Sequence, residues 1–341
     1  MSLTDRSRPD PFTHDNRHRS IMVSGFFPVY DCGAKSFIPY MPPGTGFFMD
    51  EKFSVYGLPN GIFRNLKIET CKEIPKNTRC PSGALPIVLF SGALGTSRHL
   101  YNAMLQNVAA SGYLVVSIDH PYDADIVEFT DGTIIYGTDI SSDSEVELAL
   151  NTRVSDIRFV YQQLQNHSIA EKLFVGNRHG GKISTVAVFG HSLGGAAAAA
   201  SISNSSIFLG GVNLDGTIFG PVLKSGLTHP FMLVGHENKT RETDPSWAEI
   251  WPRLAGWKRE YEVQKTAHYS FSDLPLIAFV LGIQSRLPAK VQEIIGTVDG
   301  ERIMKLTIAY VTAFLDMVLK SHTDKGFQKL DREFPEVALV H

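Results

Sequence analysis

One serine of the chain lies in a sequence context that is typical of a catalytic nucleophile. Ser192 belongs to Gly190-His-Ser-Leu-Gly194, a G-x-S-x-G pattern that stands between an apolar run at 185–190 and an alanine-rich segment. This context predicts a tight strand-to-helix turn that holds Ser192 in a strained conformation, which the flanking glycines permit. The positive end of the following helix would stabilise a negative charge developing there. We therefore expect Ser192 to act as a nucleophile.

Such a serine needs a base, because its hydroxyl is a weak nucleophile near neutral pH, and the base needs a third group that fixes its tautomer. Of the twelve histidines, His268 fits best, since it follows the last predicted strand and gives the chain order serine, acid, histidine. His191 lies in the turn itself, and we expect its side chain to point away from Ser192. The base is therefore predicted to be His268.

Two residues are candidates for the acid. Asp215 ends the strand that follows the nucleophile's helix, whereas Glu237 ends the next strand, which is the commoner place for the acid in this kind of fold. The segment around Asp215 is more apolar and suits a buried carboxylate, while Glu237 enters a polar loop. The residues favour Asp215 and leave Glu237 as the alternative.

An oxyanion hole should be formed by two backbone N–H groups. One belongs to Leu193, the residue after the nucleophile, and the other to the loop Gly92–Gly95 that follows a buried strand. Within that loop we expect Leu94 to be the donor.

Hydrophobic periodicity predicts the elements that position these residues. Expected strands lie at 21–29, 63–70, 86–90, 114–118, 185–190, 210–215, 231–235 and 259–263, and expected helices at 99–110, 146–165 and 302–319, the last in the chain. Alternating strands and helices predict an α/β fold whose mostly parallel central sheet is flanked by helices, with the site at the carboxyl ends of the strands. We expect one domain over residues 1–341.

Three segments fall outside this alternation. Residues 1–20 are charged and contain proline, which predicts an arm laid on the surface. Residues 37–49 are apolar but rich in proline and glycine, which predicts an irregular docked loop that lines the substrate pocket or contacts lipid. Residues 119–144 are predicted to be an insertion with a hairpin that turns at Asp131-Gly132.

Composition excludes several functions. The 341 residues are 43% hydrophobic and 20% charged with a net charge of −3, and no basic stripe points to nucleic acid. No apolar run reaches the ~20 residues of a membrane span, and no H-E-x-x-H or paired C-x-x-C motif suggests a metal or cofactor.

Cys71 and Cys80 flank a polar loop that a disulfide could close. The polar N-terminus fits a cytoplasmic protein or a secreted one whose signal peptide was removed, and the oligomeric state is not predicted.

The chain resembles the platelet-activating factor acetylhydrolase family of α/β-hydrolases, which are calcium-independent serine esterases. The resemblance spans about residues 84–282 and is carried by Val88–Gly95 with Arg98 and Tyr101, Ser117–His120, Gly190–Gly195, Leu214–Asp215 and Ala267–Asp273. It implies a triad of Ser192, Asp215 and His268 and an oxyanion hole at Leu94 and Leu193, and so it favours Asp215 over Glu237. Family members usually carry His-Gly before the oxyanion leucine, where this chain has Gly92-Ala93.

These observations predict a serine ester hydrolase that acts through an acyl-enzyme on a small-molecule ester, with short-chain or acetyl esters implied by the resemblance. Two alternatives use the same serine: acyl transfer or lactone formation, and hydrolysis of polyesters by an elbow similar to that of cutinases. A non-catalytic binding protein is a third alternative. The short connection at 216–230 leaves no room for a large lid, so soluble esters should be cleaved without a lipid interface.

Overall fold

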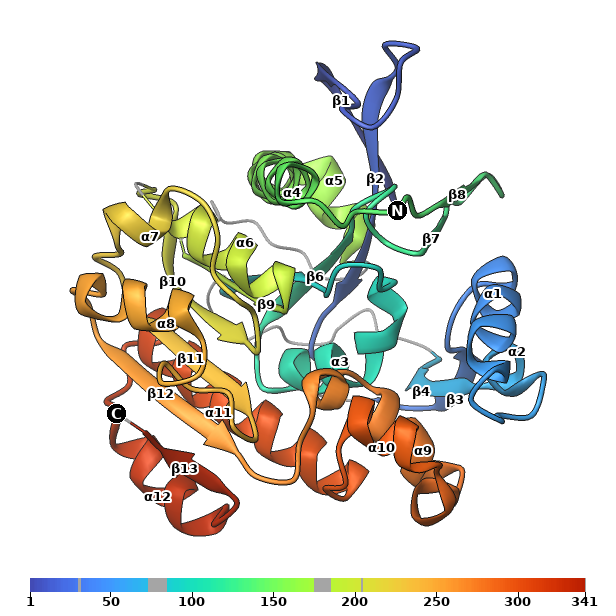
Figure 1. The fold of residues 1–341 in the computed structure, drawn as a ribbon. Helices are drawn as coiled ribbons and strands as arrows, with labels where there is room; N and C mark the ends of the chain where they lie inside the picture. Colours follow the sequence, from blue (N-terminus) through green and yellow to red (C-terminus); the bar gives the residue numbers. More distant parts are fainter. Residues whose placement is uncertain (30–31, 73–84, 175–184, 204, 341) are drawn as a thin grey trace.

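The computed structural model describes residues 1–29, 32–72, 85–174, 185–203 and 205–340. Its centre is a nine-stranded sheet with the order β1-β2-β6-β5-β9-β10-β11-β12-β13 (Figure 1). The bounds of these strands, in sheet order, are Ser2–Pro9, His18–Phe26, Leu114–Asp119, Ile87–Ser91, Val186–His191, Phe208–Leu214, Phe231–His236, Lys258–Val263 and Val337–Leu339. The strands from β6 to β12 are parallel to one another, while β1, β2 and β13 pair antiparallel at the two edges. The predicted α/β fold with a mostly parallel sheet is confirmed.

Each central strand is buried on both faces, as its continuous apolar sequence requires. In β5 the side chains of Val88 and Phe90 belong to one hydrophobic core, and those of Ile87 and Leu89 belong to the other. This division follows from the alternation of side chains along a strand. The sheet therefore separates two apolar layers, each covered by helices.

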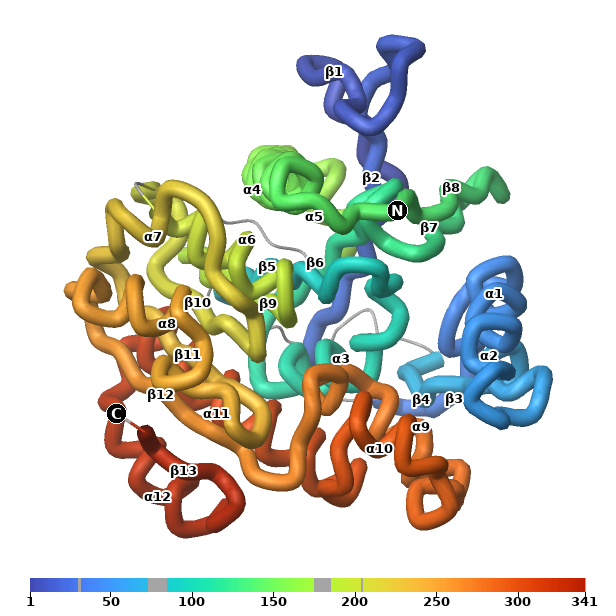
Figure 2. Tube along the Cα trace, in the orientation of Figure 1, coloured from blue at the N-terminus to red at the C-terminus, as the bar shows by residue number. Residues whose placement is uncertain are grey.

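Helices α3 and α11 pack on one face of the sheet, and α4 and α6 pack on the other (Figure 1, Figure 2). The helices α1 to α12 span Pro43–Ser54, Ile62–Asn65, Asn102–Ala110, Asp143–Leu164, His167–Leu173, Leu193–Ile202, Val222–Ser225, Pro245–Ile250, Leu274–Val280, Ala289–Ile295, Gly300–Leu319 and Lys325–Glu333. Short 3₁₀ turns lie at Arg98–Tyr101, Trp251–Arg253, His268–Phe271 and Gln284–Arg286. The small sheets β3-β4 (Lys35–Pro39, Lys67–Cys71) and β7-β8 (Ile126–Glu128, Ile134–Tyr136) lie outside the main sheet, and β7-β8 is the expected hairpin.

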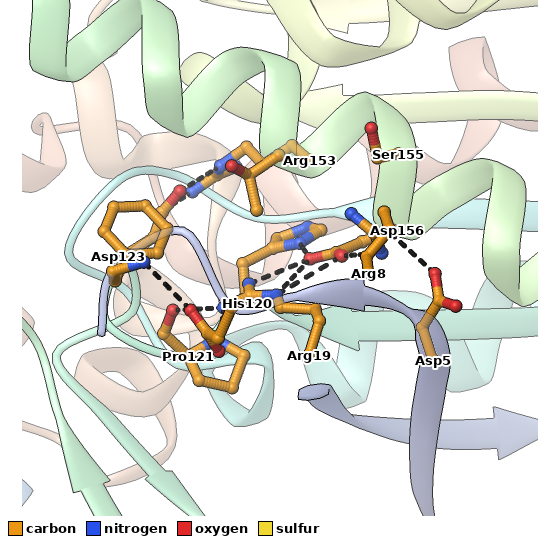
Figure 3. Close-up of polar contacts among 12 residues, drawn as sticks. Asp5, Arg8, Arg19, His120, Pro121, Asp123, Arg153, Ser155 and Asp156 are labelled. Atoms are coloured by element: carbon orange, nitrogen blue, oxygen red, sulfur yellow. Dashed lines mark hydrogen bonds and ion pairs between the residues drawn. The ribbon is translucent and has the colours of Figure 1, made fainter. Parts of the chain in front are cut away.

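The prediction that residues 1–20 form a surface arm is wrong. Most of this segment forms β1 and the start of β2, which extend the central sheet at one edge. Its charges misled the prediction because some of them enter a buried ion-pair cluster: Arg19, which is buried, and Arg8, which is partly buried, both donate to the carboxylate of Asp156 on α4 (Figure 3). Polar composition here reflects an internal ionic cluster as well as exposed positions.

The prediction of an irregular loop at 37–49 is also wrong. Strand β3 pairs with β4, and helix α1 then begins at Pro43. Proline is tolerated in the first helical turn because the N–H group that it lacks would have no partner there. The pair Pro42-Pro43 therefore marks the start of a helix. The strand expected at 63–70 is likewise split, with a single helical turn at Ile62–Asn65 before β4.

The cysteines and the C-terminal segment require two further corrections. The disulfide joins Cys32 to Cys71, residues 39 apart in the chain, and so closes a larger loop than the expected pairing of Cys71 with Cys80. Cys80 lies outside the described residues. Helix α11 is not the last, because α12 follows it and leads to β13, which pairs with the edge of β12.

Candidate active site

The nucleophile elbow connects β9 to α6, and Ser192 is its central residue. Ser192 has φ 57° and ψ −124°, a conformation that a residue with a side chain rarely adopts. Its N–H donates to the carbonyl oxygen of Leu214 at 2.8 Å, which ties the turn to the end of the neighbouring strand β10. The strain is therefore maintained by the sheet, and Ser192 stands at the N-terminal end of a ten-residue helix.

The glycines of the elbow are required by close backbone contacts. A Cβ atom at Gly190 would lie 2.3 Å from the carbonyl carbon of Gly194, and one at Gly194 would lie 2.0 Å from the carbonyl oxygen of Ser91. Neither contact can be relieved by a side-chain rotation, because both partners are backbone atoms. The elbow thus packs directly against the strand that leads into the predicted oxyanion loop.

Asp215 and His268 are brought together at the carboxyl ends of β10 and β12. The Asp215 side chain is buried, and its Oδ2 lies 2.5 Å from His268 Nδ1. Glu237, the alternative acid, is exposed in the loop after β11. The geometry favours Asp215 as the partner of His268.

A second histidine, which sequence reasoning missed, contacts the same carboxylate. His236 Nδ1 lies 2.6 Å from Asp215 Oδ1 and 2.7 Å from Oδ2, and the His236 backbone N–H donates to Oδ1 at 2.9 Å. The available signal was its position, since His236 ends β11 immediately before Glu237. Asp215 is thus held by both the strand beside it and the loop of the predicted base.

These contacts determine the protonation of the site. Burial alone would raise the pKa of Asp215, but the hydrogen bonds from His236 and His268 outweigh burial and hold that pKa well below its usual range. An ionised carboxylate only accepts hydrogen bonds, so Nδ1 of both imidazoles carries the proton. Neutral His268 therefore has its lone pair on Nε2, and its side chain is 37% exposed, which leaves it accessible to substrate.

Two N–H groups of the loop Gly92–Gly95 are engaged in hydrogen bonds. Ala93 N–H donates to the Tyr101 hydroxyl, and Gly95 N–H donates to the backbone oxygen of Asp123, each at 3.0 Å. Neither Leu94 N–H nor Leu193 N–H has a hydrogen-bond acceptor in the described part of the chain. Both predicted donors are therefore available to an oxyanion.

A buried ionic cluster lies beneath this loop. Arg153 on α4 pairs with both carboxylate oxygens of Asp123 and donates to the Gly92 carbonyl at 2.5 Å and to Ser91 Oγ at 3.0 Å. His120 lies within hydrogen-bond distance of both Ser91 Oγ and Asp156. Asp156 in turn binds Arg19 (Figure 3). The cluster connects the start of the oxyanion loop to α4 and to β2.

Two further properties bear on ligands. An open cavity of about 410 Å³ lies beside the oxyanion loop, lined by Phe48, Leu94 and Tyr136 among others. Within the described residues, the group with metal-ligating atoms in reach of one another is His191, Asp215 and His268. Because Asp215 and His268 bond directly at 2.5 Å, these atoms suit a hydrogen-bonded pair better than ligands around a cation. No helix in the described ranges is long and apolar enough to cross a membrane.

The family model, the curated relatives and the solved structure that this chain resembles all belong to ester-cleaving enzymes. The model of the family described as platelet-activating factor acetylhydrolase, isoform II, matches residues 37–132 and 145–335. A "Probable 1-alkyl-2-acetylglycerophosphocholine esterase" of Arthroderma benhamiae is 27% identical over 362 residues, covering 100% of this chain and 90% of that protein. The platelet-activating factor acetylhydrolase of Cavia porcellus is 23% identical over 279 residues, covering 72% of this chain and 59% of that protein. The solved structure of a ferulic acid esterase from Streptomyces cinnamoneus has a TM-score of 0.79 and 28% identity, covering 100% of this chain and 95% of that chain.

Proposed function

We propose that this chain, which belongs to the platelet-activating factor acetylhydrolase isoform II family and is a carboxylic-ester hydrolase of the α/β-hydrolase fold, uses Ser192, His268 and Asp215 as its catalytic triad. The observation that carries the proposal is the contact of His268 Nδ1 with the buried carboxylate of Asp215. This contact fixes the tautomer that leaves Nε2 free to accept a proton.

In the proposed reaction, His268 Nε2 accepts the Ser192 hydroxyl proton as Oγ attacks the ester carbonyl. The oxygen of the tetrahedral intermediate receives hydrogen bonds from Leu94 N–H and Leu193 N–H, together with the field of the α6 N-terminus. The imidazolium then protonates the departing alcohol, which leaves Ser192 acylated. A water molecule, deprotonated by His268, hydrolyses the acyl-enzyme and restores the serine.

For the substrate, we propose acetyl and other short-chain esters of glycerophospholipid type. Support comes from the printed activity of the Arthroderma relative, a 1-alkyl-2-acetylglycerophosphocholine esterase that aligns with the whole chain. The connection between β10 and β11 carries only the four-residue helix α7, so no large lid covers the site from this side, and soluble esters should react without a lipid interface.

A second candidate substrate class is esters of hydroxycinnamic acids. The ferulic acid esterase of Streptomyces cinnamoneus superposes on the whole chain, and Phe48 and Tyr136 line the cavity beside Leu94. Acetyl and feruloyl esters of one alcohol separate the two classes. A higher kcat/KM for the acetyl ester supports the first proposal, and a higher value for the feruloyl ester supports the second.

The triad is tested by covalent labelling. A fluorophosphonate should form one adduct per chain, mapped to Ser192, and ester hydrolysis should stop in proportion to labelling. Ser192→Ala should be folded, unlabelled and inactive. Folded wild-type protein that hydrolyses esters but carries the adduct on another residue would refute the assignment of the nucleophile.

A further inference from the structure

We propose that Tyr101 and His191 are positioning residues that fix the loop of the catalytic base relative to the oxyanion loop through one chain of buried hydrogen bonds. The inference rests on the proposed function. His191 Nε2 lies 2.8 Å from the backbone oxygen of His268, and His191 Nδ1 lies 2.8 Å from the Tyr101 hydroxyl. The Tyr101 hydroxyl in turn accepts the N–H of Ala93 at 3.0 Å. Three loops of the site therefore meet at two side chains.

The direction of every bond in this chain is determined. A carbonyl oxygen only accepts, so Nε2 of His191 carries the proton that it donates to His268. Neutral His191 then has a lone pair on Nδ1, and the Tyr101 hydroxyl must donate its proton there. The remaining lone pairs of that hydroxyl accept from Ala93. All donors and acceptors are paired, as a buried network requires.

The surroundings keep His191 neutral. His191 and Tyr101 are fully buried. The charged or titratable groups around His191 are His268, Asp215 and Arg153, besides the Tyr101 hydroxyl and the ring of Tyr269. Burial, reinforced by His268 and Arg153 and opposed by Asp215, lowers the pKa of His191 to about 3. A second proton on Nδ1 would break the hydrogen bond from Tyr101. The neutral state of His191 therefore preserves the whole series of hydrogen bonds.

The consequence for catalysis is geometric. His191 directly precedes Ser192, and its ring centroid lies 4.8 Å from that of His268. Because Tyr101 binds the Ala93 N–H, the next N–H group, that of Leu94, is the one presented to an oxyanion. The same two side chains thus set the position of the base and the choice of the donor, although neither touches the reacting atoms.

The first test compares two tyrosines. Tyr101→Phe removes a hydroxyl from the chain, and kcat should fall about 10- to 100-fold, as expected for misplaced catalytic groups, with KM within threefold. Affinity for a trifluoromethyl ketone, which forms a tetrahedral adduct, should fall in parallel. The matched control is Tyr113→Phe. Tyr113 is equally buried, but its hydroxyl donates to Asp316 on α11, which has no part in the hydrogen bonds described above. A folded Tyr101→Phe protein with kcat within twofold of wild type, or an equal loss in Tyr113→Phe, would overturn the proposal.

The second test separates the two ends of His191. In His191→Asn the amide oxygen takes the place of Nδ1 and can accept from Tyr101, but nothing reaches the His268 carbonyl. In His191→Gln the longer amide can donate to that carbonyl but no longer accepts from Tyr101. If the bonds act as one chain, the Tyr101→Phe/His191→Asn double variant should lose less activity than the product of the single losses. Losses that multiply fully would show two independent structural effects and overturn the proposal.

A readout without turnover separates this inference from the proposed function. In ¹⁵N-histidine NMR spectra of the resting wild-type protein, His191 should carry its proton on Nε2 and should not titrate between pH 5 and 8. Tyr101→Phe should shift the His268 signals, whereas Tyr113→Phe should not. If His191 titrates in this range, or is protonated on Nδ1, the proposed series of hydrogen bonds is overturned, whether or not the protein cleaves esters. The expected spectrum in a protein that no fluorophosphonate labels would support the chain and refute the proposed function instead.

Discussion

The imidazole of His236 lies against the carboxylate of Asp215, with Nδ1 2.6 Å from Oδ1 and 2.7 Å from Oδ2. Asp215 therefore contacts two histidines, His236 and His268, and only His268 is the predicted base. The backbone N–H of His236 adds a third donor. This arrangement fixes the orientation of the carboxylate before His268 binds a proton, and each contact can be removed separately.

Removing the His236 side chain should weaken catalysis moderately. In His236→Ala, Asp215 keeps the backbone donor and His268, so we expect kcat/KM to fall about tenfold, whereas Asp215→Asn should reduce kcat by up to ~10⁴ through the wrong tautomer of His268. Steady-state kinetics on a soluble acetyl ester measures both. The neighbouring control Glu237→Gln should stay within twofold. A larger loss in Glu237→Gln than in Asp215→Asn would move the acid to β11.

The pH dependence should distinguish His268 from His191. We expect activity to fall on acidification because protonated His268 cannot accept the serine proton. Asp215 remains ionised because its pKa is held low, and His191, with a pKa of about 3, remains neutral above pH 5. Neither accounts for a loss of activity between pH 5 and 8. A pH-independent kcat/KM over this range would contradict a histidine base.

His191 also makes stability depend on pH, with a defined sign. Its pKa is about 3 in the folded protein against the ordinary 6.5, so the unfolded chain binds more protons between these values. The contribution of neutral His191 to the free energy of unfolding should therefore be fully present above pH 6.5 and should decline as the pH falls toward 3. Urea unfolding between pH 4.5 and 7 measures this slope. His191→Gln lacks the titrating group and should show a shallower slope, and an unchanged slope would contradict the buried neutral state.

The elbow should not tolerate a methyl group at position 194. A Cβ there would lie 2.0 Å from the Ser91 carbonyl oxygen and 2.6 Å from that of Gly92, so Gly194→Ala must move either the elbow or the oxyanion loop. We expect a lower melting temperature and a loss of fluorophosphonate labelling. Gly326→Ala is the control, since no atom lies within 4 Å of its added Cβ and position 326 is inside α12. Alanine there should stabilise the helix by up to about 1 kcal/mol.

The Arg153–Asp123 pair should contribute to both stability and activity, and a pair of variants separates the two. Arg153→Met leaves Asp123 buried without its cation, which should cost about 3–5 kcal/mol of unfolding free energy. Arg153→Met/Asp123→Asn removes both charges and should recover part of that stability. It should not recover activity, because the Gly92 carbonyl still lacks its donor. Arg17→Met, at an exposed ion pair with Asp15, should leave melting temperature and activity unchanged. Full recovery of activity in the double variant would show that Arg153 acts through stability alone.

The sequence was most informative where local chemistry alone determines structure. Short apolar runs rich in β-branched residues, such as 86–90 and 114–118, favour buried strands, and β5 and β6 lie there. The elbow could be predicted because the tight turn itself requires a glycine, as the contact of an added Gly190 Cβ with the Gly194 backbone shows. The predicted parallel sheet and the location of the site at its strand ends followed from these elements.

Features that depend on distant partners could not be predicted. His236 approaches Asp215 only because β10 and β11 pair in register, with Asp215 N–H bonded to the Val234 carbonyl. Likewise, the charged residues of β1 and β2 look exposed until their partner on α4 is known. In both cases the deciding contact joins side chains from separate elements, which hydrophobic periodicity does not describe.

The ion pairs of Asp156 also bear on how the chain folds during synthesis. Arg19 and Arg8 precede Asp156 by 137 and 148 residues, and β2 pairs with β6, which begins at Leu114. At about 5–20 residues per second, the N-terminal strands leave the ribosome on the order of ten seconds before the helix that carries Asp156. During that interval the hairpin has unpaired strand edges, and Arg8 and Arg19 have only Asp5 and Asp10 as ion-pair partners. Such edges are prone to aggregate. Nascent chains paused before α4 should therefore depend most on chaperones.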